Sequence, residues 1–264
     1  MMQTVTSNDG TTIAYDLTGT GPALILVGGA LSERSAGAPL ATLLAPSFTV
    51  ISYDRRGRGD STDTAPYAVE REIEDIAALI AQAGGFASLY GMSSGAMLAL
   101  RAAAHGLPIT KLAMYEPPVI IDDTRAPIPQ DYVPHLGALA SSGRRGEAVE
   151  YFMSAAVQVP PAMVAEMRGT PMWPGMEAVA HTLAYDGAIM GDTMSGERAT
   201  LQQFASVTTP TLVIDGGASP VWMRNSAQAL VDVLPNARRL TLEGQTHAVD
   251  PQLLAPILRA FFSE

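Results

Sequence analysis

The sequence of 264 residues predicts an α/β fold in which a mostly parallel, eight-stranded sheet is flanked by helices. One observation is a set of short apolar runs bounded by Gly, Pro or Asp, which is the pattern of strands buried on both faces. Another is that helical patterns separate most of these runs. Strands that alternate with helices form βαβ units, whose strands are parallel.

The chain opens on a predicted β-hairpin. Residues 3–6 and 12–15 alternate between apolar and polar side chains, and the Asp9-Gly10 turn signal lies between them. Six apolar runs follow the hairpin and complete the eight predicted strands. These runs are residues 23–27, 48–53, 87–90, 111–115, 211–214 and 239–242.

Helical patterns connect or follow most of the predicted strands. They cover residues 67–82, 95–105, 222–234 and 251–262. The last of these helices has two start signals, because Asp250 can cap its amides and Pro251 fits its first position.

One long interval interrupts the alternation. Residues 117–209 contain no convincing strand, only helical stretches at 144–157, 161–168, 176–190 and 197–204. We therefore expect a core domain made of residues 1–116 and 210–264. Residues 117–209 are expected to form a helical cap inserted after the sixth strand.

The segment Gly91-Met92-Ser93-Ser94-Gly95 matches the pattern G-x-S-x-G. It lies between a buried strand and an Ala/Leu-rich helix, the context in which a nucleophilic serine is presented on a tight turn. Glycines two positions before and after Ser93 let neighbouring backbone pass without a Cβ clash, which favours Ser93 over Ser94. The helix that follows directs amides and the positive end of its dipole toward the reacting oxygen.

This elbow resembles that of the α/β-hydrolase superfamily, and the resemblance extends over nearly the whole chain. Residues 27–30 (Val-Gly-Gly-Ala) look like the family's turn after its third strand, with Gly28 in place of the usual His. By this resemblance, the backbone amides of Ala30 and Ser94 would form the oxyanion hole. Residues 54–61 resemble the family's Asp-x-Arg-Gly-x-Gly-x-Ser stretch, which we interpret as a structural loop.

The predicted general base is His247. Of the four histidines, it is the one that follows the last predicted strand and precedes the C-terminal helix. The family places its catalytic His there, last in the order Ser, acid, His. In such a triad the imidazole takes the serine proton and returns it to the leaving group.

The acid departs from the usual family pattern. Most members carry it in the loop after the seventh strand, where this chain has Ser219. We predict Glu116, after the sixth strand, as in the haloalkane dehalogenases and a zearalenone-type lactonase that this chain resembles here. Pro117 is expected to keep Glu116 in extended backbone. Asp215 is the alternative acid, and Asp250 a weaker one.

The resemblance implies a serine hydrolase that cleaves a small to medium hydrophobic carboxylic ester or lactone. A methionine-rich cap suggests an apolar pocket above Ser93, because methionine adapts to irregular apolar space. Candidate wall residues are Met92, Trp173 and Trp222. The fold also hosts C–C bond hydrolases, lyases and perhydrolases, and a non-catalytic small-ligand receptor is a further alternative.

Composition excludes several other classes. A net charge of −10 disfavours a nucleic-acid partner, which needs a basic surface. The chain has no cysteine, so disulfides and thiolate metal sites are excluded. We expect no metal and no organic cofactor. No apolar run reaches the roughly 18 residues of a membrane span, and the first residues lack a signal-peptide pattern, so a cytoplasmic protein is expected. Monomer and homodimer both stay open.

Overall fold

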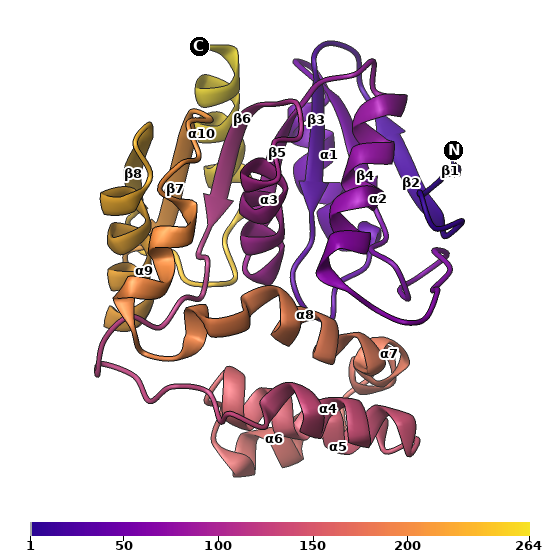
Figure 1. The fold of residues 1–264 in the computed structure, drawn as a ribbon, viewed down its shortest axis with the longest axis vertical. Coiled ribbons are helices and arrows are strands. Elements are labelled where there is room, and N and C mark those ends of the chain that lie inside the picture. Colours follow the sequence, from indigo (N-terminus) through magenta and orange to yellow (C-terminus); the bar gives the residue numbers. More distant parts are fainter. Residues whose placement is uncertain (1) are drawn as a thin grey trace.

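The structure, a computed structural model, describes residues 2–264. It confirms the predicted α/β fold: eight strands form one sheet in the order β1-β2-β4-β3-β5-β6-β7-β8 (Figure 1). The β1–β2 and β2–β4 pairs are antiparallel and the remaining pairs are parallel. The strands are β1 (Met2–Thr6), β2 (Thr12–Thr18), β3 (Ala23–Val27), β4 (Thr49–Tyr53), β5 (Ala87–Met92), β6 (Ile109–Tyr115), β7 (Thr211–Gly216) and β8 (Ala237–Leu242).

Helices cover both faces of the sheet. Helices α1 (Ala38–Leu44) and α10 (Pro251–Ser263) share one apolar cluster with the sheet. Helices α2 (Val69–Gln82), α3 (Ser94–Ala104) and α9 (Val221–Val233) pack in another, on the face turned to the viewer in Figure 1. The Asp250 carboxylate accepts a hydrogen bond from the amide of Gln252 at 2.8 Å, which confirms the predicted cap of α10.

Five α-helices lie between β6 and β7. In Figure 1, α8 runs along the end of the sheet where the parallel strands finish, and α4 to α7 lie beyond it. The five are α4 (Tyr132–Ser141), α5 (Arg145–Tyr151), α6 (Pro161–Arg168), α7 (Trp173–Val179) and α8 (Leu183–Met190). Shorter helical segments are the π-helical Phe152–Ala156 and the 3-10 segments Arg34–Gly37, Ala180–Thr182, Gly191–Met194 and Arg198–Phe204.

The inserted stretch does not pack as one unit. Residues of α4 to α7 form their own apolar cluster, which also contacts Ala30 and Leu31. By contrast Val119, Ile120 and several residues between 189 and 207 belong to the main core under the sheet. The division into a core and a cap of residues 117–209 therefore stays a prediction.

Candidate active site

Ser93 occupies a sharp turn between β5 and α3. Its backbone dihedrals are φ 56° and ψ −128°, a combination that residues with a side chain rarely adopt. The Ser93 amide donates to the carbonyl of Tyr115 at 2.9 Å, and its own carbonyl accepts from the amide of Ala96 at 3.0 Å. The turn is held in place on both sides, and it projects the serine beyond the end of β5.

The two glycines of the elbow are required by packing. A Cβ on Gly91 would lie 2.5 Å from the Cα of Ala96, inside van der Waals contact. A Cβ on Gly95 would lie 2.4 Å from the carbonyl oxygen of Val27. Both contacts are with backbone, which cannot move aside, so this elbow needs glycine at both positions.

Glu116 and His247 form a hydrogen-bonded pair, although 131 residues separate them. The distance from His247 Nδ1 to Glu116 Oε2 is 2.8 Å, and Glu116 Oε1 accepts a second bond from the amide of Gly216 at 2.9 Å. The Glu116 side chain is fully buried, whereas that of His247 is 47% exposed. Carboxylate contact at Nδ1 favours the tautomer protonated there and leaves Nε2 as the basic nitrogen.

The environment of Glu116 favours its ionised form. Burial alone raises the pKa of a carboxyl, but hydrogen bonding from His247 and the Gly216 amide, with a smaller effect of the nearby Ser219 hydroxyl, outweighs burial and lowers the pKa below its usual value. Ser219 lies where most family members carry the acid. Its buried hydroxyl makes no hydrogen bond of normal length and angle, so we assign it a minor part in this effect.

This lowered pKa predicts how stability should change with pH. Because Glu116 binds its proton less tightly in the folded chain than in the unfolded one (about 4.3 for an unperturbed Glu), the carboxylate stabilises the fold above that pH. The contribution is lost as pH falls through the folded pKa. The difference in melting temperature between the wild type and Glu116→Gln should therefore shrink on acidification from pH ~6 to below pH ~4. Thermal melts across that range check it, and a difference that widens in acid would contradict it.

The backbone of Glu116 differs from the prediction. Pro117 was expected to hold Glu116 in extended backbone, but its φ is +45°, in the left-handed region. Two tertiary hydrogen bonds account for the difference. The Glu116 amide donates to the carbonyl of Ile214 at 2.9 Å, and its carboxylate binds the Gly216 amide. These contacts to β7 outweigh the local preference set by the proline.

The two alternative acids, Asp215 and Asp250, bind other partners than His247. The Asp215 carboxylate is buried and binds Arg239 on β8, with distances of 2.7 Å to Nε and 2.9 Å to Nη2. Asp250 caps α10, as described above. Of the three candidate carboxylates, Glu116 is therefore the one that the structure brings to His247.

Tyr115 links the segments that carry Ser93, Glu116 and His247. The sequence did not point to this residue. Its carbonyl accepts from the Ser93 amide, and its hydroxyl donates to the carbonyl of Thr246 at 2.6 Å. Burial raises the pKa of the phenol, so it keeps the proton that it donates. In the sequence Tyr115 resembles any apolar strand residue, and only the fold reveals these contacts.

The segments that carry the predicted oxyanion amides lie beside the nucleophile. A Cβ on Gly29 would be 3.0 Å from Ser93 Cβ and 3.7 Å from Ser93 Oγ, so the loop before Ala30 packs directly on the serine. Ser94 is the first residue of α3. Within residues 2–264, no hydrogen bond uses the amide of Ala30 or of Ser94, which leaves both donors able to bind an oxygen atom.

The predicted wall residues occupy different surroundings. Met92 is partly buried and packs against the apolar cluster of α1 and α10. Trp173 is buried among α4 to α7, and its indole N–H donates to Glu177 at 2.7 Å. Trp222 lies at the start of α9, and the guanidinium carbon of Arg125 lies 4.5 Å from the centroid of its ring. Their roles as pocket walls stay predictions.

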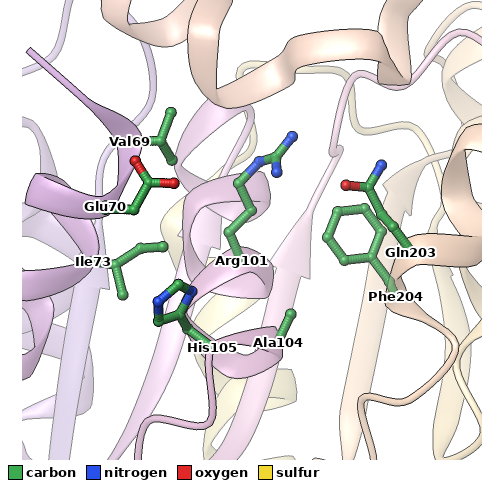
Figure 2. Close-up of a pocket in the computed structure, with 8 residues that line it drawn as sticks. All are labelled: Val69, Glu70, Ile73, Arg101, Ala104, His105, Gln203 and Phe204. Carbon is green, nitrogen blue, oxygen red and sulfur yellow. The ribbon is translucent and has the colours of Figure 1, made fainter.

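Two surface hollows lie away from these residues. One, of about 220 Å³, is bordered by side chains from α2, α3 and the 198–204 segment (Figure 2). The other, of about 330 Å³, lies around Arg34. Neither is lined by Ser93, Glu116 or His247. The side chains that line the first are Val69, Glu70, Ile73, Arg101, Ala104, His105, Gln203 and Phe204.

In residues 2–264, no group of three or more His, Asp or Glu side chains is placed to hold a metal ion. None of the helices there has the length and apolarity required to cross a membrane.

Comparison with known proteins agrees with this geometry. The family model described as "Alpha/beta hydrolase family" matches residues 24–257. An alpha/beta hydrolase from Sphaerobacter thermophilus is 62% identical, with a TM-score of 0.91 over 98% of this chain and 100% of that one. The enol-lactonase from Burkholderia xenovorans, at 21% identity and a TM-score of 0.73 over 99% of this chain and 100% of that one, shares the fold.

A curated relative matches over a shorter stretch. The uncharacterized hydrolase YraK of Bacillus subtilis is 35% identical over 95 residues, which are 34% of this chain and 35% of that protein. The match therefore spans about a third of either chain, whereas the family model spans most of this one. On the family model and the Sphaerobacter structure together, the chain belongs to the alpha/beta hydrolase family.

Proposed function

We propose that this chain is a serine hydrolase that cleaves a small to medium hydrophobic carboxylic ester or lactone through an acyl-serine intermediate. The observation that carries the proposal is the 2.8 Å pair between the buried Glu116 and His247. A serine on a strained elbow and a histidine oriented by a buried carboxylate, whose segments Tyr115 connects, are the parts that activate a hydroxyl for acyl transfer.

The first half of the proposed reaction forms the acyl-enzyme. Ser93 Oγ attacks the substrate carbonyl carbon while His247 Nε2 takes the hydroxyl proton. Glu116 accepts a hydrogen bond from His247 Nδ1–H and stabilises the imidazolium that results. The carbonyl oxygen becomes an oxyanion, which the amides of Ala30 and Ser94 bind. His247 then gives its proton to the leaving alkoxide, and the C–O bond of the ester breaks.

The second half releases the acid. Water attacks the acyl carbon as His247 takes one of its protons, and the second oxyanion collapses to free Ser93 Oγ, which recovers its proton from His247. For a lactone the leaving alkoxide stays attached to the acyl group, so the product is a single hydroxy acid. The balance of atoms requires only substrate and water.

Two features support an apolar substrate. The oxyanion loop at Ala30 and Leu31 packs against the apolar cluster of α4 to α7, so we propose that these helices cover the substrate beside Ser93. This cluster and its surroundings hold several methionines, which suit varied apolar ligands. The Burkholderia enol-lactonase and an esterase from a Rhodococcus share the fold, so lactones and esters are both suitable probes.

The test is a panel of p-nitrophenyl esters and of lactones with acyl chains of graded length. We expect hydrolysis of at least one series, with a preference for chains of intermediate length. Rapid mixing with the best p-nitrophenyl ester should release a burst of p-nitrophenol near one equivalent if deacylation is slower than acylation. Rates no higher than those of Ser93→Ala across the whole panel would contradict the proposed substrate class.

A further inference from the structure

We propose that Asp186 on α8 is a positioning residue that fixes both amide donors of the oxyanion hole. The inference rests on the function proposed above, because it assigns a purpose to that hole. Asp186 belongs to neither of the segments that supply the amides. It reaches them through buried hydrogen bonds, which we call the Asp186 network: Arg55, Arg58, Glu72, Ser94 and Asp186.

Asp186 lies at the centre of this network. Asp186 lies in the stretch inserted between β6 and β7, and it is only 4% exposed. Asp186 Oδ1 accepts from Ser94 Oγ at 2.7 Å and from Arg55 Nη1 at 2.6 Å. Asp186 Oδ2 accepts from Arg58 Nη2 at 2.7 Å. One carboxylate thus binds the first residue of α3 and two arginines of the 54–61 loop.

The same two arginines hold the other half of the oxyanion hole. Arg58 Nη1 donates to the carbonyl of Gly29 at 2.6 Å, and Arg55 Nη1 to that of Gly28 at 3.3 Å. The Gly29 carbonyl and the Ala30 N–H belong to one planar trans peptide, in which the two bonds point in opposite directions. Holding the carbonyl on Arg58 therefore turns the Ala30 N–H to the opposite side of that peptide.

Ser94 is held by a different contact. Its amide is the expected second donor, and its side chain is hydrogen-bonded to Asp186. Fixing the Cβ and Oγ of the first residue of α3 limits rotation of the peptide that carries the amide. Asp186 therefore couples the Ala30 and Ser94 donors through one rigid group, so that both can be preorganised for the same oxyanion.

The charges of the network are balanced. Arg55 binds both oxygens of Glu72 at 2.7 Å, so two arginines face two carboxylates. Burial opposes the ionisation of Asp186, but the charges of Arg55 and Arg58 lower its pKa below the usual value. Replacing Asp186 by Asn keeps the shape and leaves the arginines one negative charge short.

A matched control is Asp75 on α2, which pairs with a third arginine of the same loop. Asp75 is 1% exposed and binds Arg56 at 2.7 and 2.8 Å, so Asp75→Asn also breaks a buried arginine–carboxylate pair. Neither Arg56 nor Asp75 hydrogen-bonds to residues 28–30 or to Ser94 within the described chain. Asp75→Asn therefore reproduces the loss of stability without reaching the oxyanion hole.

The first readout is kinetic, on the best substrate of the ester and lactone panel. With activity scaled to the folded fraction, Asp186→Asn should lower kcat about 10- to 100-fold with little change in KM, since an oxyanion donor acts mainly in the transition state. Binding of an alkyl boronic acid, which forms a tetrahedral adduct with the serine, should weaken by a similar factor. Asp75→Asn should stay within about twofold of the wild type in kcat. An Asp186→Asn variant with wild-type kcat, or a loss confined to KM, would overturn the proposal.

The second readout does not depend on hydrolysis. Residual dipolar couplings of ¹⁵N-labelled protein report the direction of the Ala30 and Ser94 N–H bonds. They should change in Asp186→Asn and stay unchanged in Asp75→Asn; unchanged directions in Asp186→Asn would overturn the proposal. If Asp186→Asn does not fold, Ser94→Ala removes one network contact and keeps the charges, and it should alter the Ser94 N–H direction. A wild type inactive on the whole panel would refute the proposed function and leave this measurement intact.

Discussion

Replacing Ser93 with alanine should reduce turnover about 10⁴- to 10⁶-fold and leave the fold intact, as expected when the nucleophile of a triad is removed. The hydroxyl supplies the bond to the acyl group, and no other side chain can take its place on the elbow. Alanine keeps the Cβ, so the strained backbone at φ 56° is the same in both proteins. Steady-state hydrolysis of the best panel substrate measures the loss.

The control for Ser93→Ala is Ser88→Ala on β5, the strand that precedes the elbow. Ser88 Oγ shares a hydrogen bond with Thr110 Oγ1 in an exposed position, away from the elbow. Its activity should stay near that of the wild type. Turnover in Ser93→Ala that remains within tenfold of the Ser88→Ala control would rule out Ser93 as the nucleophile.

Glu116→Gln should lower kcat by about 10³- to 10⁴-fold, because an amide can no longer hold His247 in the required tautomer or stabilise its positive form. Gln is nearly isosteric with Glu and retains an oxygen for the Gly216 amide. The loss should therefore appear in the chemistry, with a far-UV circular dichroism spectrum like that of the wild type.

Asp215→Asn is the matched comparison. It neutralises a buried carboxylate at the end of β7, but one that binds Arg239 in place of His247. Asp215→Asn should be destabilised by about 1–3 kcal/mol, the cost of weakening a charged hydrogen-bonded pair, with kcat within about threefold of the wild type. If Asp215→Asn lost turnover and Glu116→Gln kept it, the assignment of the acid would be wrong.

Much of the fold was predictable because buried parallel strands leave a strong local signal. Residues 23–27 are apolar throughout, and the structure assigns the same residues to β3. Two helices were missed for local reasons. Helix α4 contains Pro134 and Gly137, both of which lower helix propensity, and α1 has only seven residues. Packing against α5 and α8 stabilises α4, and no local sequence pattern reveals that packing.

Residues of the candidate site were predictable where a local motif or a position between predicted elements marks them. The elbow is defined by two glycines around Ser93, and His247 by its place after the last strand. Asp186 left no such signal, since an acid in a helix normally lies on the surface. The left-handed backbone of Glu116 was unpredictable because its hydrogen bonds to β7 join residues about 100 positions apart.

The structural role of the 54–61 loop was predictable, but the partners of its arginines were not. Its glycines and arginines predicted a structural loop, and its arginines indeed form buried ion pairs with Glu72, Asp75 and Asp186. Only the fold shows that Arg58 also binds the carbonyl of Gly29 beside Ser93. The partners of these arginines come from distant segments, so their identity depends on tertiary structure.

The central claim is that His247 and Glu116 activate Ser93 as a nucleophile. The most direct measurement is the rate of labelling by an alkyl fluorophosphonate, followed by intact mass and by peptide mapping of the modified residue. The account predicts one adduct per chain, on Ser93, formed at least about 100-fold more slowly in His247→Ala and Glu116→Gln than in the wild type. An unlabelled wild type, an adduct on another residue, or labelling of Ser93 at the same rate in both variants would contradict it.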